Sequence, residues 1–395
     1  MPKTLFAALL LLAGLWLTPA SATEQKRPPA PSESPTQSPA DATDAKDEGK
    51  KWQESDESEE VGALAPILQK LGVGPKELKA LSIHPHLGHP VEVDVGMQII
   101  SIPGIDESGE SYSIHGRIDL GWRDPRLASA ERTETVQFRE DEATLLLDYL
   151  WWPDVSFHNG LGEAEHKNRS LILEPNGEMR LYLSVDSEFT YTSDLRYMPF
   201  DIQTLPIVVE SFGANPGWVM LKPSAERSGY EDAPPDWRIT DFRTAHHIKD
   251  ADHAGGKTSQ AHFELRIQRH GDYYIWRVMF PIVLVVIVTW WMLWFSPSQF
   301  EARLQMGIVG ILTLVAFNMS LMDSIPNIPY LTVMDLFYLN GLVAIFIATA
   351  ESLLVYNYHE RGLDARALRI DRIMRLMLPL LTFGGWSVLL TLATL

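Results

Sequence analysis

The stretch SQFEARLQMGIVGILTLVAFNMSLMD, from Ser298 to Asp323, decides the architecture of this 395-residue chain. It is apolar and long enough to cross a lipid bilayer as a helix, which takes about 20 residues. It nevertheless begins with a charged group and an amide, Glu301 and Gln305, which are costly against lipid. The stretch therefore predicts a membrane helix with one face turned toward protein or water.

Six residues of this stretch recur every three or four positions and share one face of the predicted helix. In order they are Glu301, Gln305, Val309, Leu312, Ala316 and Ser320. One helix cannot enclose a pore, but several copies around an axis can. A ring of Glu301 carboxylates would favour cations, and a ring of Leu312, with Val309 and Ala316 near it, would form an apolar constriction that closes by dewetting.

Two structural roles compete with this pore hypothesis. Ser298-Gln-Phe-Glu301 is a capping-box pattern, so Glu301 could satisfy the start of the helix, alone or together with a pore role. Leu312 could pack between helices, as most membrane leucines do. The spacing alone leaves these alternatives open.

The last third of the chain is predicted to be an all-α transmembrane domain, residues 273–395. Tyr273–Phe295 is a full span with aromatic residues at both ends, as expected at the membrane interfaces. The four helices are expected at about 273–295, 301–322, 331–356 and 373–395.

The first 88 residues are predicted to hold three different segments. Residues 1–22 combine a basic start, a short apolar run and an Ala-x-Ala ending, which is typical of a cleaved signal peptide; an uncleaved anchor is the alternative. Residues 23–60 form an acidic Pro/Ser-rich tether that is expected to be disordered. Residues 61–88 predict a short helical extension.

Residues 89–272 alternate apolar and polar residues in many short runs, which predicts an immunoglobulin-like antiparallel β-sandwich. Pro175-Asn176-Gly177 marks a hairpin between two of the strands.

A cleaved signal peptide places this domain outside the cytoplasm. With four membrane helices, the connection between the third and fourth helices is then cytoplasmic, and the C-terminus is on the same side as the sandwich. The third connection carries a basic group, which favours the cytoplasm: Arg361, Arg366, Arg369, Arg372 and Arg375.

Composition excludes several functions. The formal net charge of −18 argues against a nucleic-acid partner, and the absence of cysteine removes disulfides, thiolate metal sites and cysteine nucleophiles. No nucleophile–base pattern or nucleotide loop is present, so we predict neither enzyme nor cofactor. His84–His89 (HPHLGH) and the acidic loop with Glu231, Asp232 and Asp236 could bind a metal ion, but surface loops are the stronger interpretation and we predict no metal site.

The sequence YTSDLRYMPFDIQTL contains Met198-Pro199-Phe200-Asp201 and Gln203, and it resembles the signature loop of the pentameric ligand-gated ion channels, the Cys-loop receptors. Tyr191 and Leu205 stand where other members carry a cysteine pair, so the resemblance is to the bacterial branch. WRDPRL, LWWPDVSF, DWRITDF, RHGDYYIWRVMFP and IPNIPYLTVMD resemble further family motifs in the same order, over residues 90 to 395.

The resemblance implies a homopentamer around a central pore lined by the second membrane helix. Glu301 then falls at the selectivity position and Leu312 at the gate. The other lining positions are Gln305, Val309, Ala316, Met319 and Ser320. The resemblance also implies an Asp201–Arg269 pair that couples the sandwich to the membrane, next to a set of loop residues: Pro199, Phe200, Pro326, Pro329 and Tyr330.

The family binds agonists between subunits, in a box of aromatic residues. The positions that match are Phe157, Phe212 and Phe263, while Thr244 replaces one aromatic residue and Arg117 stands on the facing subunit. Arg117 suits a carboxylate better than an amine. Histidines also gather in this half, among them His158, His246 and His247, so protons are a second candidate agonist or modulator.

The sequence thus predicts a bacterial cation-selective ligand-gated channel in the cytoplasmic membrane, with a periplasmic sandwich and monovalent cations passing through the pore. A non-conducting anchored receptor and an anion channel of the same fold are the alternatives. A tethered periplasmic hydrolase is a more distant one.

Overall fold

A computed structural model of the chain describes residues 65–74, 80–85, 87–129, 132–211, 215–250, 257–321 and 328–394, all within one unit, Val61–Leu395. The signal peptide and tether predicted for residues 1–60 lie outside the described residues, as do Phe212 and Pro326. Of the predicted N-terminal extension, residues 65–71 are helical.

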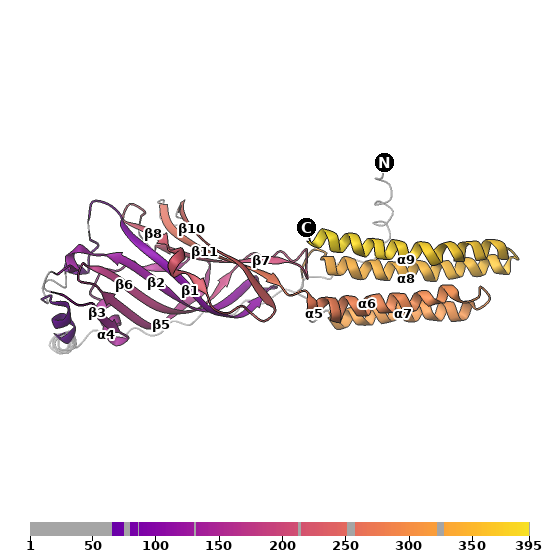
Figure 1. The fold of residues 1–395 in the computed structure, drawn as a ribbon, viewed down its shortest axis with the longest axis horizontal. Coiled ribbons are helices and arrows are strands. Elements are labelled where there is room, and N and C mark those ends of the chain that lie inside the picture. The colour runs from indigo at the N-terminus through magenta and orange to yellow at the C-terminus, as the bar shows by residue number, and fades with distance from the viewer. Residues whose placement is uncertain are drawn as a thin grey trace, which may run out of the picture. The chain divides into compact units, whose positions relative to one another are not determined.

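The first half of the unit is a sandwich of two sheets (Figure 1). One sheet has the order β3-β5-β6-β2-β1-β8, with β9 also paired to β1, and the other has the order β10-β11-β7-β4. The strands are β1 (Val91–Asp106), β2 (Ser111–Arg123), β3 (Val136–Arg139), β4 (Val155–Phe157), β5 (Gly160–Leu173), β6 (Glu178–Thr190), β7 (Ile202–Ser211), β8 (Val219–Pro223), β9 (Gly229–Tyr230), β10 (Trp237–Asp250) and β11 (Lys257–Arg269). Short helical segments lie between them: η1 (Pro125–Leu127), α4 (Asp141–Leu147) and η2 (Ala225–Arg227).

Alternating side chains build the sandwich core. On β1, Val91, Val93 and Val95 are buried while the residues between them are exposed, so one face of the strand meets the other sheet. The hairpin between β5 and β6 forms as predicted. Gly177 adopts a φ of 81° in the turn, a conformation that residues with a side chain rarely adopt.

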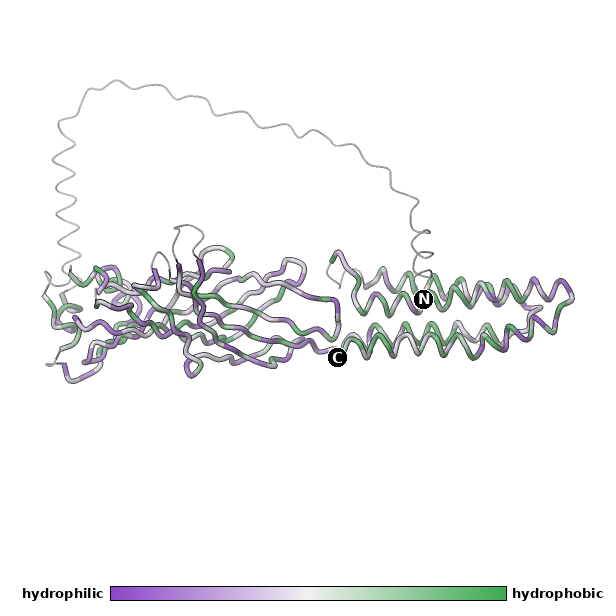
Figure 2. The backbone as a smooth tube through the Cα atoms, turned by 90° about the horizontal axis from the view of Figure 1, so that it is seen from above, coloured by the Kyte–Doolittle hydropathy of each residue, from purple (hydrophilic) through white to green (hydrophobic). Residues whose placement is uncertain are grey.

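Four apolar helices follow the sandwich, each long and apolar enough to cross a membrane (Figure 2). The first is continuous from Asp272 to Trp294, and consists of α5 (Asp272–Tyr274), a π-helical turn η3 (Ile275–Met279), α6 (Phe280–Trp290) and a 3₁₀ turn η4 (Trp291–Trp294). The others are α7 (Phe300–Leu321), α8 (Val333–Glu360) and α9 (Asp364–Thr394). The sandwich followed by four apolar helices is the fold class that the sequence predicts.

The fourth helix differs from its expected bounds. It begins at Asp364, nine residues before the expected start at 373, and the third connection shrinks to residues 361–363. Alanine, leucine and arginine are good helix formers, so the basic segment continues the helix beyond its apolar part. Four of the five arginines assigned to the connection therefore lie on α9. The third helix also extends to Glu360, beyond the expected 356.

Candidate functional site

One face of α7 is uncovered by the rest of the chain. Glu301, Gln305, Val309, Leu312 and Ala316 are all exposed, and the exposed fraction of Leu312 is 61%. Met319 and Ser320, about one turn after Ala316, are exposed as well. The residues that helical spacing assigned to one face thus lie together on a surface that no described residue covers.

The opposite face of α7 packs closely on its neighbours. A side-chain carbon at Gly307 would lie 2.2 Å from Thr349 Oγ1 on α8, and one at Gly310 would lie 2.4 Å from Thr289 Oγ1 on α6. Both distances are too short for any residue but glycine. The two glycines therefore let α7 approach α6 and α8, and they fix which face remains outside.

The capping-box interpretation of Glu301 is wrong. The helix begins at Phe300, and Ser298 shares a hydrogen bond of 2.9 Å with Ser296 rather than capping the first turn. A capping box is present at another helix, where Thr332 and Asp335 bond reciprocally at the start of α8. Glu301 is therefore not required to satisfy the start of α7.

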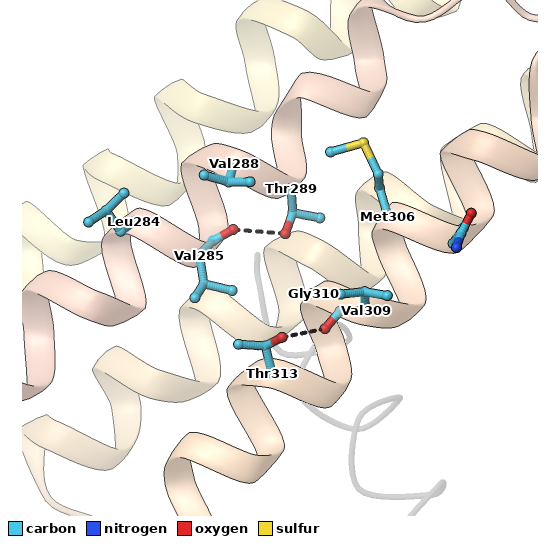
Figure 3. Close-up of a pocket in the computed structure, with 9 residues that line it drawn as sticks. Leu284, Val285, Val288, Thr289, Met306, Val309, Gly310 and Thr313 are labelled. Atoms are coloured by element: carbon cyan, nitrogen blue, oxygen red, sulfur yellow. Dashed lines mark hydrogen bonds between the residues drawn. The ribbon is translucent and has the colours of Figure 1, made fainter.

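A groove of about 450 Å³ lies between α6 and α7, beside the exposed face (Figure 3). Gln305 and Val309 line it together with apolar residues of both helices. The hydroxyls of Thr289 and Thr313 donate to carbonyls of their own helices, Val285 O at 2.8 Å and Val309 O at 2.7 Å. The groove is therefore a mostly apolar surface suited to packing against another helix.

The second part of the site is a buried ion pair at the junction between sandwich and helices. Arg269, the last residue of β11, donates to Asp201 from Nε at 2.7 Å and from Nη2 at 3.1 Å. Its third nitrogen, Nη1, lies 2.7 Å from Glu107 Oε1, and the guanidinium stacks 4.2 Å from the ring centroid of Trp237. Gln203 Nε2 donates to Asp201 Oδ2 at 2.7 Å, so every charged group here is paired and bonded.

These contacts change the protonation of Arg269. Burial alone would lower its pKa, but hydrogen bonds and charges from Asp201 and Glu107 together raise the pKa above its usual range. The arginine therefore stays charged. The sequence anticipated the Asp201–Arg269 pair but missed Glu107, which lies at the end of β1 with no sequence signal to link it to Arg269.

Loop residues from both domains meet beside this pair. Phe200 packs on the hydrophobic core of the helices, next to Gly271, and Pro199 is buried beside it. The amide of Leu195 donates to Tyr330 Oη at 3.1 Å, and that of Val333, the first residue of α8, donates to Arg196 O at 2.9 Å.

The guanidinium of Arg196 lies 5.6 Å from the ring centroid of Tyr330. Pro329 is exposed at this junction. The β6–β7 loop is thus bonded directly to the segment that enters α8.

A chain of polar side chains crosses the outer end of the four-stranded sheet. His158 Nδ1 lies 3.2 Å from Glu210 Oε2, which accepts from Gln260 Nε2 at 3.0 Å. Gln260 Oε1 in turn accepts from His262 Nε2 at 3.1 Å, and the rings of His262 and His247 are 4.4 Å apart. These contacts therefore link His158, the residue that follows β4, to residues of β7, β11 and β10.

His246 completes this histidine cluster, which we define as His158, His246, His247 and His262. It bonds Ser259 Oγ at 3.0 Å. Burial lowers the pKa of His262 to about 4, helped by the charges of His247 and Lys249. Burial and the charge of His247 also lower the pKa of His246. Both rings are therefore neutral near pH 7 and resist protonation.

Two comparisons with known proteins agree with this architecture. A family model described as the neurotransmitter-gated ion-channel ligand binding domain matches residues 80–271. The gamma-aminobutyric acid receptor subunit beta-4 of Gallus gallus is 27% identical over 73% of this chain and 60% of its own length. The gamma-aminobutyric acid receptor subunit beta-like of Drosophila melanogaster is 26% identical over 71% of this chain and 58% of its own length.

The sandwich of this chain thus resembles the ligand-binding domain of the neurotransmitter-gated ion channels, and the similarity to the receptor subunits extends into the helices. The chain spans about three fifths of the length of the relatives it matches. The four apolar helices after the matched domain are each long and apolar enough to cross a membrane, which fits a multi-pass membrane protein. The chain lacks cysteine, so no disulfide can form between Tyr191 and Leu205, the two positions that the sequence resemblance assigned to a cysteine pair.

Two of the three aromatic residues predicted for the agonist box, Phe157 and Phe263, pack toward the sandwich core, and the third, Phe212, lies outside the described residues. Phe263 is completely buried in the sandwich core, so its assignment to the box is wrong. Phe157 also packs toward the core, edge-on against Phe189 at 5.1 Å between ring centroids. The neighbouring His262 and His158 face outward instead, because successive strand residues point to opposite faces. Period-two alternation along β11 would have identified His262.

Arg117 lies on the exposed surface of the other sheet, on β2. Its guanidinium is 5.8 Å from the ring centroid of Tyr182 on β6. Arg180 lies on the same strand, two residues before Tyr182, and its interaction with Tyr182 raises the pKa of Arg180. Two arginines near one aromatic ring form a surface that suits an anionic group.

Proposed function

We propose that five copies of the chain form a cation-selective, ligand-gated pore lined by α7. The exposed face of α7, with Glu301, Gln305, Val309 and Leu312 in line, carries the proposal. A helix that served only as an anchor would have no use for a carboxylate and an amide on an uncovered face. In a ring, Leu312 would form the apolar gate and Glu301 the charged mouth.

The charge next to the mouth supports cations rather than anions. Arg303 follows Glu301 by two residues, but its side chain is completely buried and paired with Asp371 at 3.0 Å. The pore face at this level therefore presents a carboxylate without a competing arginine. We expect the pore to pass monovalent cations such as Na⁺.

Current from purified protein in planar bilayers under a NaCl gradient tests this function. We expect currents that reverse near the sodium equilibrium potential, and reduced selectivity in Glu301→Gln. Glu360→Gln is the matched control, because Glu360 is an exposed acid at the end of α8 and outside the pore face. Reversal near the chloride potential would establish the anion-selective alternative.

Leu312→Ser separates a channel from a non-conducting receptor. A hydroxyl at the gate should wet the constriction and increase resting current severalfold. Leu380→Ser on α9 is the control, because Leu380 is exposed to a similar degree, 64% against 61%. If wild type and Leu312→Ser are both silent, the chain is a receptor that does not conduct.

We further propose that protons act on the histidine cluster as agonist or modulator. The lowered pKa of His262 means that its neutral form is favoured by the fold. Protonation as the pH falls from about 6.5 toward 4 therefore costs stability, and it would push the ends of β10 and β11 apart. Steps of pH on the sandwich side should change the current, and His262→Gln should weaken the response.

His115→Gln is the control for this experiment, because His115 bonds Asp186 on the other sheet. An unchanged pH response in His262→Gln would exclude the histidine cluster as the site of proton action.

A carboxylate agonist is the second candidate, supported by Arg117, Arg180 and Tyr182 and by relatives whose names include gamma-aminobutyric acid. Arg117→Gln should then reduce the response to small carboxylates.

The junction supplies the coupling in this proposal. Arg269, Asp201 and Phe200 join the sandwich to the helices, and Tyr330 lies just before α8. We expect movement of the sandwich to reach the start of α8 through these contacts. We place the protein in a bacterial cytoplasmic membrane, with the sandwich and C-terminus on the periplasmic side.

A further inference from the structure

Arg303 and two carboxyl groups are buried together where α6 leads into α7, and a second, half-buried arginine, Arg375, contacts them. We call Arg303, Glu351, Asp371 and Arg375 the buried charge cluster. Arg303 donates from Nη1 and Nη2 to the two oxygens of Asp371, each at 3.0 Å. Arg375 donates to the same carboxylate at 2.7 Å. Asp371 thus accepts three hydrogen bonds from two guanidinium groups.

This cluster fastens the base of the proposed pore helix. Arg303 lies on α7 two residues after Glu301, and its Nη2 also donates to the carbonyl of Phe295. Arg375, on α9, donates from Nε to the carbonyl of Leu293 at 2.8 Å. The connection between α6 and α7 is therefore bound from two helices at once, and a change in the cluster would act directly beside Glu301.

Glu351 on α8 is the one carboxyl group of the cluster without a hydrogen bond. Its exposed fraction is 5%, and both oxygens lack a partner among the described residues. Glu351 Oε2 lies 3.8 Å from Arg303 Nη1, and this distance is too long for a hydrogen bond. Arg303 Nη1 already donates to Asp371. The charged groups that face Glu351 are Arg303 from α7 and Asp371 and Arg375 from α9.

Two opposing terms act on this carboxyl group. An ionised carboxylate buried without hydrogen bonds is costly, and a proton removes that cost. Ionised Glu351, however, makes the cluster neutral, with two positive and two negative charges, whereas protonated Glu351 leaves one excess positive charge. Glu351 is therefore free to exist in either state.

We propose that Glu351 is a proton-binding site through which pH at the cytoplasmic face adjusts the base of the pore helix. A proton from water forms one O–H bond on Glu351, which can then donate to Asp371. The attraction between Glu351 and Arg303 is lost, so the hold on α7 beside Glu301 changes. The readout rests on the proposed pore and its orientation, but proton binding does not.

The test steps pH on the side opposite the sandwich, between 8 and 5, while the sandwich side stays at constant pH. We expect the wild-type current to change with these pH steps. The Glu351→Gln variant should lose this pH response, and at every pH its current should equal that of the wild type at pH 5. His359→Gln is the control, because His359 is a titratable residue near the same end of α8, bonded to Asp364. A wild-type response retained in Glu351→Gln, or lost in His359→Gln, would overturn the proposal.

Thermal unfolding of the purified protein tests the proton site without current. We expect the difference in unfolding temperature between wild type and Glu351→Gln to change between pH 5 and pH 8. A constant difference would overturn the proposal. A pH-dependent difference in a protein that conducts no ions would keep the proton site and overturn the pore. If Glu351→Gln fails to assemble, Glu351→Met removes the same proton site at similar volume.

Discussion

Two buried arginines in this receptor have similar partners but different surroundings. Arg269, at the junction, and Arg303, at the base of the pore helix, each bind an aspartate through two nitrogens. Each also faces a glutamate. At the junction Glu107 lies 2.7 Å from Arg269, whereas Glu351 lies 3.8 Å from Arg303 and makes no hydrogen bond.

This difference separates a fixed contact from an adjustable one. The Arg269 site is fully bonded, so it holds one geometry at the end of the sandwich that leads into the helices. The Arg303 site has one carboxyl group that can change its charge without breaking a hydrogen bond. Mutations at matched positions of the two sites test whether the distinction is real.

Removal of either aspartate should have the largest effect on stability. Asp201→Ala and Asp371→Ala each leave a buried guanidinium without its main partner, which costs about 3–5 kcal/mol. We expect lower unfolding temperatures and poor assembly, measured by thermal unfolding and size-exclusion chromatography. Glu92→Gln is the control, because Glu92 pairs with Lys222 on the surface and should change little. If the protein tolerated one aspartate mutation but not the other, the two arginines would not depend equally on their aspartates.

Glu107→Gln should have the next largest effect. The mutation replaces a charged hydrogen bond to Arg269 with a neutral one, at a cost of about 1–3 kcal/mol. The unfolding temperature of the purified protein measures it. A neutral outcome would mean that Asp201 alone satisfies Arg269, and the junction would then be no more tightly bonded than the pore base.

Glu351→Gln should change stability by less than about 1 kcal/mol near neutral pH, because no hydrogen bond is lost and a costly buried charge disappears. Comparison with Glu107→Gln in one thermal unfolding series gives the sharpest contrast between the sites. A loss as large as that of Glu107→Gln would contradict the assignment of Glu351 as the unbonded member.

Tyr191→Phe should have the smallest effect. The Tyr191 hydroxyl is buried near the Arg269 site and has no hydrogen-bond partner among the described residues. Its removal should shift stability by less than about 0.5 kcal/mol, or slightly stabilise the protein. A clear destabilisation would show that the junction depends on a polar contact beyond those described.

The sequence could predict features that depend on local pattern. The membrane helices follow from apolar length, and the β5–β6 hairpin follows from Pro175 to Gly177. The face of α7 follows from the spacing of Glu301, Gln305 and Val309, because residues three or four apart on a helix point the same way. The Asp201–Arg269 pair required the resemblance to the family, since nothing local connects two residues on different strands.

Other features depend on contacts between distant segments and could not be read from one sequence. Arg303 and Asp371 are 68 residues apart in the sequence and lie on different helices. Helix periodicity indicates which face of each helix is apolar, but not which residue of one helix contacts which residue of the other. A shift of one residue along β11 separates Phe263, in the core, from His262, on the surface, so a small alignment error exchanges the two faces.

The reversal potential of single-channel or macroscopic current under a NaCl gradient, in wild type and Glu301→Gln, tests the central claim most directly. The account predicts reversal near the sodium equilibrium potential in wild type and a shift away from it in Glu301→Gln. Reversal near the chloride potential, or a selectivity that Glu301→Gln leaves unchanged, would contradict the assignment of the α7 face as a cation-selective pore lining.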